Sequence, residues 1–296
     1  MISRSYRPAT ILRYHHRVKM FATFLDDIHV SRNMPIPTYY VGLYVAKLFK
    51  EGLAPATIRL ALSAIGWFHR MSNAPDPTLA PAIQRMIMGA KRAAPPPKKL
   101  DPITRPLLHI MVTKVDSLPS SDFQRRLTKA LLLLGYHACA RVGELVVSGN
   151  ADHTLKMENL SIRQVRGNTG IHFELESYKH SKGKIEFELL PGDDPVLCLV
   201  RHLISYLELR GTGPGCLFLN ATRAPVRREF LANQIQMLAG LLGLAKEKFN
   251  THSLRIGRTT DMAAERESEA NIKRTGRWNS PAYLGYVRFA SFVLPK

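Results

Sequence analysis

Hydrophobic residues recur at roughly helical spacing through the first hundred residues. Over residues 10–25 they alternate with basic residues in the pattern of an amphipathic helix. Three more helices are predicted in this part: one after Pro37 that ends at Gly52, one after Pro55 that runs through Phe68, and one over about 79–92. Four short helices in succession predict a compact all-α module.

A proline-rich run follows this module. Residues 93–99 read Ala-Ala-Pro-Pro-Pro-Lys-Lys. Consecutive prolines cannot continue a helix, because they lack N–H donors and favour polyproline II geometry. We therefore expect an N-terminal helical domain at 1–92, a linker at 93–100 and a second domain at 101–296, and a chain of 296 residues is long enough for two domains.

The periodicity changes within the second part. Residues 171–178 and 185–190 alternate in the manner of strands, and residues 180–184 between them read as a hairpin turn. Helical patterns cover residues 102–115, 122–134, 195–209, 228–242, 253–265 and 280–287. The expected fold is mainly α with a small antiparallel β-sheet, in which a four-helix N-terminal domain precedes an α+β domain.

The charge balance narrows the class of partner. Lys and Arg number 42 against 23 Asp and Glu, a net charge of +19. A surplus of this size repels itself unless a polyanion neutralises it, so nucleic acid is the first candidate partner. A merely basic soluble protein is the alternative, whereas a role on a membrane surface would call for one strongly amphipathic basic helix.

Cysteine usage and the N-terminus favour an intracellular protein. Cys139, Cys198 and Cys216 are widely spaced and form no Cys-x-x-Cys pair for zinc or redox chemistry. The first residues lack the apolar core of a signal peptide, and the longest apolar stretch, around 131–134, is too short to span a membrane. We expect a soluble protein with no metal and no cofactor.

The second part contains residue types suited to cleaving a phosphodiester without a metal. Negative charge grows on the phosphate oxygens during such a reaction, and arginine binds two of these oxygens at once. Arg141 occurs in Ala-Arg-Val-Gly-Glu-Leu, where Glu144 either orients a functional group or forms an i,i+3 ion pair. Lys182, in the expected hairpin turn, can donate a proton to a leaving group; Lys179 and Lys184 compete for this role.

Two later segments supply further candidates. His252 and Arg255 fall in His-Ser-Leu-Arg at the start of a predicted helix, where positions i and i+3 share a face. Gly-Arg-Trp-Asn-Ser follows about twenty residues later, and Tyr286 lies eight residues after Trp278. A phenol has a pKa of about 10 in water, so nucleophilic attack by Tyr286 would need a strongly positive pocket. Tyr283 is the alternative nucleophile.

In this order the segments resemble the signature of the tyrosine recombinase (integrase) family, from about residue 100 to residue 288. The Gly-Arg-Trp-Asn-Ser version is similar to that of enzymes from eukaryotic DIRS-like and Crypton-like mobile elements. The resemblance implies one role for each matching residue: Arg141 and Arg255 hold the scissile phosphate, Lys182 protonates the leaving 5′ hydroxyl, His252 assists proton transfer, Trp278 fills the second histidine-or-tryptophan position, Tyr286 attacks phosphorus, and Glu144 supports the first arginine.

The resemblance also implies an activity and an assembly. A site-specific DNA recombinase of this family cleaves and rejoins strands through a 3′-phosphotyrosyl intermediate without ATP or metal, in the integration or excision of a mobile element. The expected partner is double-stranded DNA, bound by a homotetramer on two sites with a dimer on each; a eukaryotic source would place the protein in the nucleus. The alternatives are a type IB topoisomerase and a domesticated DNA-binding protein that no longer cuts.

Basic residues of the helical module and the linker are the candidates for further DNA contacts. They are Arg59, Lys91, Arg92, Lys98 and Lys99. The cluster around the prolines can follow a DNA backbone or act as an import signal, and a plain solvated linker is the open alternative.

Overall fold

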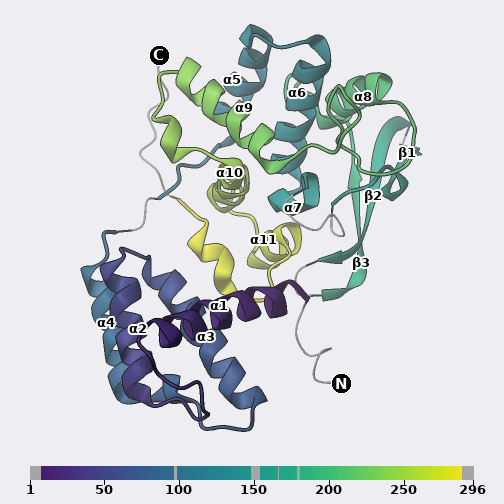
Figure 1. Cartoon of the computed structure of the whole chain (residues 1–296). Helices are drawn as coiled ribbons and strands as arrows, with labels where there is room; N and C mark the ends of the chain where they lie inside the picture. The colour runs from purple at the N-terminus through teal and green to yellow at the C-terminus, as the bar shows by residue number, and fades with distance from the viewer. Residues whose placement is uncertain (1–7, 97–98, 148–153, 166, 179–180, 289–296) are drawn as a thin grey trace. The chain divides into compact units, whose positions relative to one another are not determined.

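The chain divides into two compact units, residues 1–97 and residues 98–296 (Figure 1). The computed structural model describes residues 8–96, 99–147, 154–165, 167–178 and 181–288. None of the helices in these ranges has the length and apolarity that crossing a bilayer requires.

The first unit is a helical module with its own core. Its helices are α1 (Pro8–Asp27), α2 (Thr38–Lys50), α3 (Pro55–Met71) and α4 (Pro81–Ala93), with a 3-10 turn η2 (Pro77–Leu79) before α4. Proline stands in the first turn of α3 and of α4, where its fixed φ suits the start of a helix. Apolar faces of all four helices meet in one core, as the sequence predicted: it includes Phe21, Leu25, Val41, Tyr44, Ile58, Ile65 and Ile83.

The second unit surrounds α6 (Asp122–His137), in which every residue from Leu131 to Leu134 is buried. A capping box between Ser121 and Gln124 fixes the start of this helix. The other helices are α5 (Arg105–Lys114), α7 (Val142–Leu145), α8 (Leu199–Arg210), α9 (Arg228–Leu241), α10 (Thr251–Ala264) and α11 (Glu269–Gly276), and the 3-10 turns are η3 (Val115–Ser117), η5 (Met157–Asn159), η6 (Lys246–Lys248) and η7 (Pro281–Gly285).

A three-stranded antiparallel sheet lies beside these helices (Figure 1). Its strands β1 (Leu160–Val165), β2 (Asn168–Tyr178) and β3 (Ser181–Leu189) pair in chain order. Ile171 and Phe173 of β2 are buried in the core of the second unit. The mainly helical fold with a small antiparallel sheet is the fold class that the sequence predicted.

Two local predictions were wrong. The turn predicted over residues 180–184 is shorter, because β3 already begins at Ser181 and Lys182 pairs with Ser177. Residues 280–287 form only the short turn η7 instead of a helix. The reason lies in a contact with a distant segment. The hydroxyl of Thr260 on α10 donates to the carbonyl of Tyr286 and accepts the N–H of Arg288, so the end of this segment bonds to α10.

Close contacts around α10 fix the helices that hold the candidate residues. A Cβ on Gly257 would lie 1.8 Å from the carbonyl oxygen of Ile103, so only glycine lets the segment before α5 approach α10 this closely. On the same helix, the carboxylate of Asp261 accepts the N–H of Arg105 and the hydroxyl of Tyr136. These bonds join α5, α6 and α10.

Candidate active site

A tight turn after α6 positions the first arginine. Cys139 has a positive φ of 45°, and α7 begins directly afterwards with Arg141 at its N-cap. Glu144 accepts the Arg141 backbone N–H at 2.8 Å and binds the guanidinium Nη1 at 3.1 Å. The Arg-x-x-Glu spacing is therefore an i,i+3 ion pair in which the carboxylate is buried.

The second arginine lies on α10 and is completely buried. Asn250 caps this helix by accepting the His252 N–H at 2.7 Å. Arg255, one turn later, is 1% exposed, and its two terminal nitrogens donate to the carbonyls of Cys139 and Gly276. In this conformation Arg255 is held by the backbone of two turns.

Aromatic rings cover the Arg255 guanidinium. Its Cζ lies 4.2 Å from the centre of the Trp278 ring and 5.4 Å from that of Tyr286, both within cation–π range. The centre of the Tyr286 ring lies 5.0 Å from the centre of the Trp278 ring and 5.0 Å from that of the His252 ring. Residues from α10, from the segment after α11 and from the segment after η7 thus form one aromatic and cationic cluster.

His252 favours its neutral form at this place. Its pKa is lowered from the ordinary value, first by partial burial and then by the nearby positive charges of Arg255, Arg228 and Arg288. Although the residue as a whole is exposed to solvent, a neutral imidazole can accept a proton at neutral pH. It is therefore suited to act as a base beside Tyr286.

An open hollow of about 470 Å³ lies in front of this cluster. We call it the Tyr286 hollow; it is lined by Arg141, Arg277, Trp278, Asn279, Ser280, Ala282 and Tyr286. The partly exposed guanidinium of Arg141 and the phenol of Tyr286 at one hollow suit an anionic group such as a phosphate, whereas the Arg277 guanidinium is buried behind it.

The two candidate tyrosines differ in burial. Tyr286 is half-buried and lines the hollow, whereas Tyr283 is 9% exposed and packs with Met262 and Ile272. Of the two phenols, only that of Tyr286 faces the space that a substrate can enter.

The structure brings six of the seven catalytic candidates into one region: Arg141, Glu144, His252, Arg255, Trp278 and Tyr286. The seventh, Lys182, lies in β3, and its side chain is outside the described part of the chain, as is that of Lys184. Lys179 lies wholly outside the described residues.

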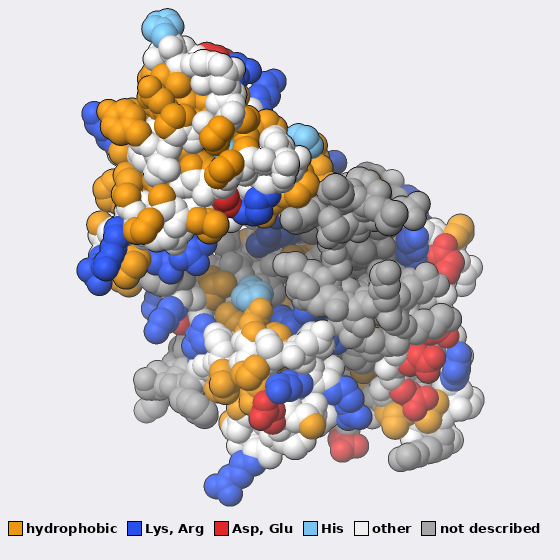
Figure 2. Space-filling view, turned by 90° about the horizontal axis from the view of Figure 1, so that it is seen from below, with side chains coloured by type: hydrophobic (Ala, Val, Ile, Leu, Met, Phe, Trp, Pro, Cys, Tyr) orange, Lys and Arg blue, Asp and Glu red, His pale blue; other side chains and the backbone are white. Residues whose placement is uncertain are grey.

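Four of the five other basic candidates are exposed. Arg59 lies on α3 beside a hollow of about 350 Å³ that Tyr14 and Arg70 also line. Lys91 and Arg92 stand in the last turn of α4, and Lys99 is exposed after it, while Lys98 lies outside the described residues. On the face drawn in Figure 2, Lys and Arg side chains are spread widely and acidic side chains are fewer.

Arg277 was not among the predicted site residues. It lies in the Gly-Arg-Trp motif, but its residue type alone does not distinguish it from a surface arginine. In the structure its side chain is buried, pairs with Glu144 and lines the Tyr286 hollow. The available signal was its place between a glycine and a tryptophan after a helix, where glycine is more usual.

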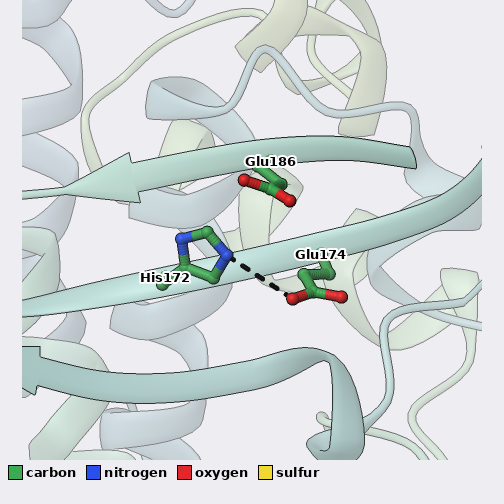
Figure 3. A group of neighbouring side chains, drawn as sticks. All are labelled: His172, Glu174 and Glu186. Atoms are coloured by element: carbon green, nitrogen blue, oxygen red, sulfur yellow. Dashed lines mark ion pairs between the residues drawn. The ribbon is translucent and has the colours of Figure 1, made fainter.

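One group in the described part of the chain has side chains suited to a metal ion. His172 and Glu174 on β2 and Glu186 on β3 have ligand atoms within 4.8 Å of one another (Figure 3). His172 Nε2 lies 3.7 Å from a carboxylate oxygen of Glu174, which gives an ion pair when the imidazole is protonated. His172 and Glu174 are thus a polar pair on the sheet with Glu186 beside them, and none of the three residues lines the Tyr286 hollow.

Comparisons with known proteins agree with this architecture. Residues 1–73 match the phage integrase N-terminal SAM-like domain family. A comparison with curated protein sequences finds no match.

Solved structures share the fold over nearly the whole chain. A lambda integrase dimer bound to a COC′ core site is 17% identical with a TM-score of 0.64, covering 100% of this chain and 76% of that chain. The Tn1549 transposon integrase in complex with circular intermediate DNA is 13% identical with a TM-score of 0.61, covering 97% and 92%. A lambda integrase tetramer bound to a Holliday junction is 16% identical with a TM-score of 0.59, covering 95% and 75%. The chain therefore has the fold of these integrases, in which a SAM-like helical domain precedes a mainly helical domain with a small antiparallel sheet.

Proposed function

We propose that this protein is a tyrosine recombinase that cleaves and rejoins DNA strands at specific sites, with Tyr286 as the nucleophile. The observation that carries the proposal is that His252, Arg255, Trp278 and Tyr286 form one cluster, and that Arg141 lines the hollow in front of it together with Trp278 and Tyr286. In this reaction the phenol oxygen bonds to phosphorus and the 5′ oxygen of the next nucleotide leaves. The covalent 3′-phosphotyrosyl bond conserves the energy of the phosphodiester, so rejoining needs neither ATP nor a metal ion.

Arg141 is the residue best placed to bind the scissile phosphate. A guanidinium has five N–H donors, and the side-chain contacts of Arg141 with Glu144 and with the Arg277 carbonyl leave further donors for phosphate oxygens. Because these donors are fixed before the reaction, they stabilise the charge that grows on the phosphate oxygens without reorganising.

Arg255 acts on the same phosphate only after a local movement. Its guanidinium lies beneath the Trp278 and Tyr286 rings, so a direct contact requires the Tyr286 ring to turn away, as an attacking phenol must. Until then Arg255 contributes a positive charge beside the Tyr286 ring.

Two other residues move protons in this scheme. His252, held neutral by its surroundings, accepts the proton that the Tyr286 phenol loses. Lys182, near the β2–β3 hairpin, protonates the leaving 5′ oxygen; Lys179 and Lys184 are the alternatives for this step. Glu144 orients Arg141, and Trp278 supports both Arg255 and Tyr286.

The assembly belongs to the same proposal. We place the DNA-contacting helical domain at residues 1–92 and the catalytic domain at 101–296, with Arg59, Lys91, Arg92, Lys98 and Lys99 on the DNA backbone. By analogy with the lambda integrase tetramer on a Holliday junction, four copies would act on two DNA sites. The Gly-Arg-Trp motif suggests a mobile element of the DIRS-like or Crypton-like kind, which would place the protein in a nucleus.

Capture of the covalent intermediate tests the proposal. Because the DNA site is unknown, the substrate is a library of duplexes with randomised sequence and a nick beside the cleavage position, which traps cleaved strands. Protein–DNA complexes that resist denaturing detergent are isolated, and their DNA is sequenced. We expect wild type and Tyr283→Phe to form them and Tyr286→Phe to form none while it still binds DNA.

The outcome also separates the rival functions. Covalent capture by Tyr283 alone would overturn the choice of nucleophile. Complexes that relax supercoiled plasmid without exchanging strands between two duplexes would identify a type IB topoisomerase. DNA binding by wild type without any covalent capture would identify a DNA-binding protein that no longer cleaves.

A further inference from the structure

The backbone of Arg277 has a conformation that disfavours arginine. The residue directly follows α11 with φ 57° and ψ 50°, in the left-handed region. Glycine is the usual residue at such helix ends because it has no Cβ, and another residue costs about 1 to 2 kcal/mol there. The side-chain contacts of Arg277 therefore have to offset a backbone cost.

These contacts are buried and directed at one turn. The Arg277 side chain is 1% exposed, and its Nη2 forms an ion pair with Glu144. The same guanidinium donates to the carbonyl of Ala138 at 3.1 Å and to that of Cys139 at 3.4 Å. Arg277 thus binds both the turn between α6 and α7 and the buried carboxylate of α7.

Two of these contacts, those with Glu144 and with the carbonyl of Cys139, are shared with the two other site arginines. The second carboxylate oxygen of Glu144 binds Arg141 Nη1, and Arg141 Nη2 donates to the carbonyl of Arg277 itself at 3.3 Å. The carbonyl of Cys139, which Arg277 approaches, also accepts a hydrogen bond from Arg255. Arg277 therefore shares an acceptor or a carboxylate with both arginines.

The charges explain why this sharing matters. Glu144 is buried, and its negative charge lies between the guanidiniums of Arg141 and Arg277. Burial is the largest influence on Arg277 and lowers its pKa, Arg255 and Arg141 lower it further, and Glu144 raises it. With Arg277 absent, Glu144 would pair with Arg141 alone, and a carboxylate that holds a guanidinium by both oxygens competes directly with a phosphate.

We propose that Arg277 is a positioning residue: by binding Glu144 and the turn at 138–139, it leaves Arg141 free to bind the substrate phosphate and keeps Arg255 in place. This role rests on the proposed recombinase function, since it concerns the same phosphate. Arg277 touches no reacting atom in this account and acts through its two neighbours.

The test replaces Arg277 by glycine, because glycine removes the side chain and favours the left-handed backbone that the turn already has. On a duplex that wild type cleaves, we expect Arg277→Gly to lower the cleavage rate at saturating DNA about 100-fold, as expected for a displaced catalytic group. DNA affinity should stay close to that of wild type. The matched control is Arg274→Gln, which removes a charge from an exposed arginine three residues earlier.

A double variant distinguishes positioning from a merely structural role. Removing the charge of Glu144 as well, in Arg277→Gly/Glu144→Gln, should restore at least about tenfold of the lost rate, because the carboxylate that competes with the phosphate for Arg141 is then gone.

Arg277→Lys keeps the positive charge and is the variant to test if Arg277→Gly does not fold. Because lysine has fewer donors than arginine, the cleavage rate of Arg277→Lys should fall about tenfold. Cleavage by Arg277→Gly and Arg277→Lys at the rate of the Arg274→Gln control would overturn the inference. So would a double variant in which the rate losses of Arg277→Gly and Glu144→Gln simply multiply, with no rescue. If wild type itself forms no covalent complex, the proposed function fails rather than this inference.

Discussion

The packing of Trp278 against Gly276 gives the sharpest prediction. A Cβ added to Gly276 would lie 1.7, 2.2 and 2.3 Å from Cζ3, Cε3 and Cη2 of the indole. Nonbonded carbons approach to about 3.5 to 4.0 Å, so in Gly276→Ala the ring has to move by about 2 Å. This indole ring is the one that covers Arg255: its centre lies 4.2 Å from Cζ of Arg255 and 5.0 Å from the centre of the Tyr286 ring.

Both stability and cleavage should suffer. Overpacking of this kind costs about 1 to 3 kcal/mol, which corresponds to a fall in the melting temperature of roughly 2 to 12 °C for a unit of this size. Misplacement of the cluster by an ångström or more should lower the cleavage rate by about 100-fold. Thermal unfolding and covalent capture measure the two effects separately.

The chain provides a matched control and a rescue. Gly285, next to Tyr286, has no atom within 4 Å of an added Cβ, so Gly285→Ala should change neither quantity. The three clashing atoms all belong to the six-membered ring of the indole, so Gly276→Ala/Trp278→His should regain the lost stability. A Gly276→Ala protein as stable and as active as Gly285→Ala would refute the assignment of Trp278 to the site.

Three further predictions concern protonation, phosphate binding and packing. Burial lowers the pKa of His137 from 6.5 to about 4; since the unfolded chain takes up this proton first, stability should fall as pH drops from about 6.5 to about 4, by at most about 3 kcal/mol. In urea titrations across this range, His137→Gln should flatten the pH dependence. Arg141→Lys should lower covalent capture by at least about 100-fold while DNA affinity, measured by fluorescence anisotropy, stays nearly unchanged, because lysine cannot hold two phosphate oxygens in one plane. Tyr136→Phe leaves the partly buried carboxylate of Asp261 without its hydroxyl donor and should lower the free energy of unfolding by about 1 to 3 kcal/mol.

Local patterns in the sequence were enough for most of the helices. Apolar periodicity predicted the four helices of the first unit and the long helices of the second, because an amphipathic helix shows its buried face in its spacing. The spacing also predicted the Arg141–Glu144 ion pair as one of two possibilities, and placed His252 and Arg255 on the start of one helix. Such contacts join residues three positions apart, so they can be predicted without the tertiary structure.

These sequence patterns did not predict contacts between segments that are distant in the chain. The turn η7 is not a helix because Thr260 of α10 binds its end, and the shorter hairpin follows from pairing between Ser177 and Lys182. Arg277 was overlooked for the same reason, since its partners Ala138, Cys139 and Glu144 lie more than 130 residues earlier.

By itself, the sequence determined the fold class, the positive charge and the residue types available for phosphate chemistry, because composition and periodicity are properties of the chain. The tertiary structure alone decided how those residues are used. It buried Arg255 under two aromatic rings, left the phenol of Tyr286 facing a hollow and that of Tyr283 in the core, and placed Glu144 between two guanidiniums. Burial and shared charge depend on which distant segments pack together, and spacing along the chain does not record that.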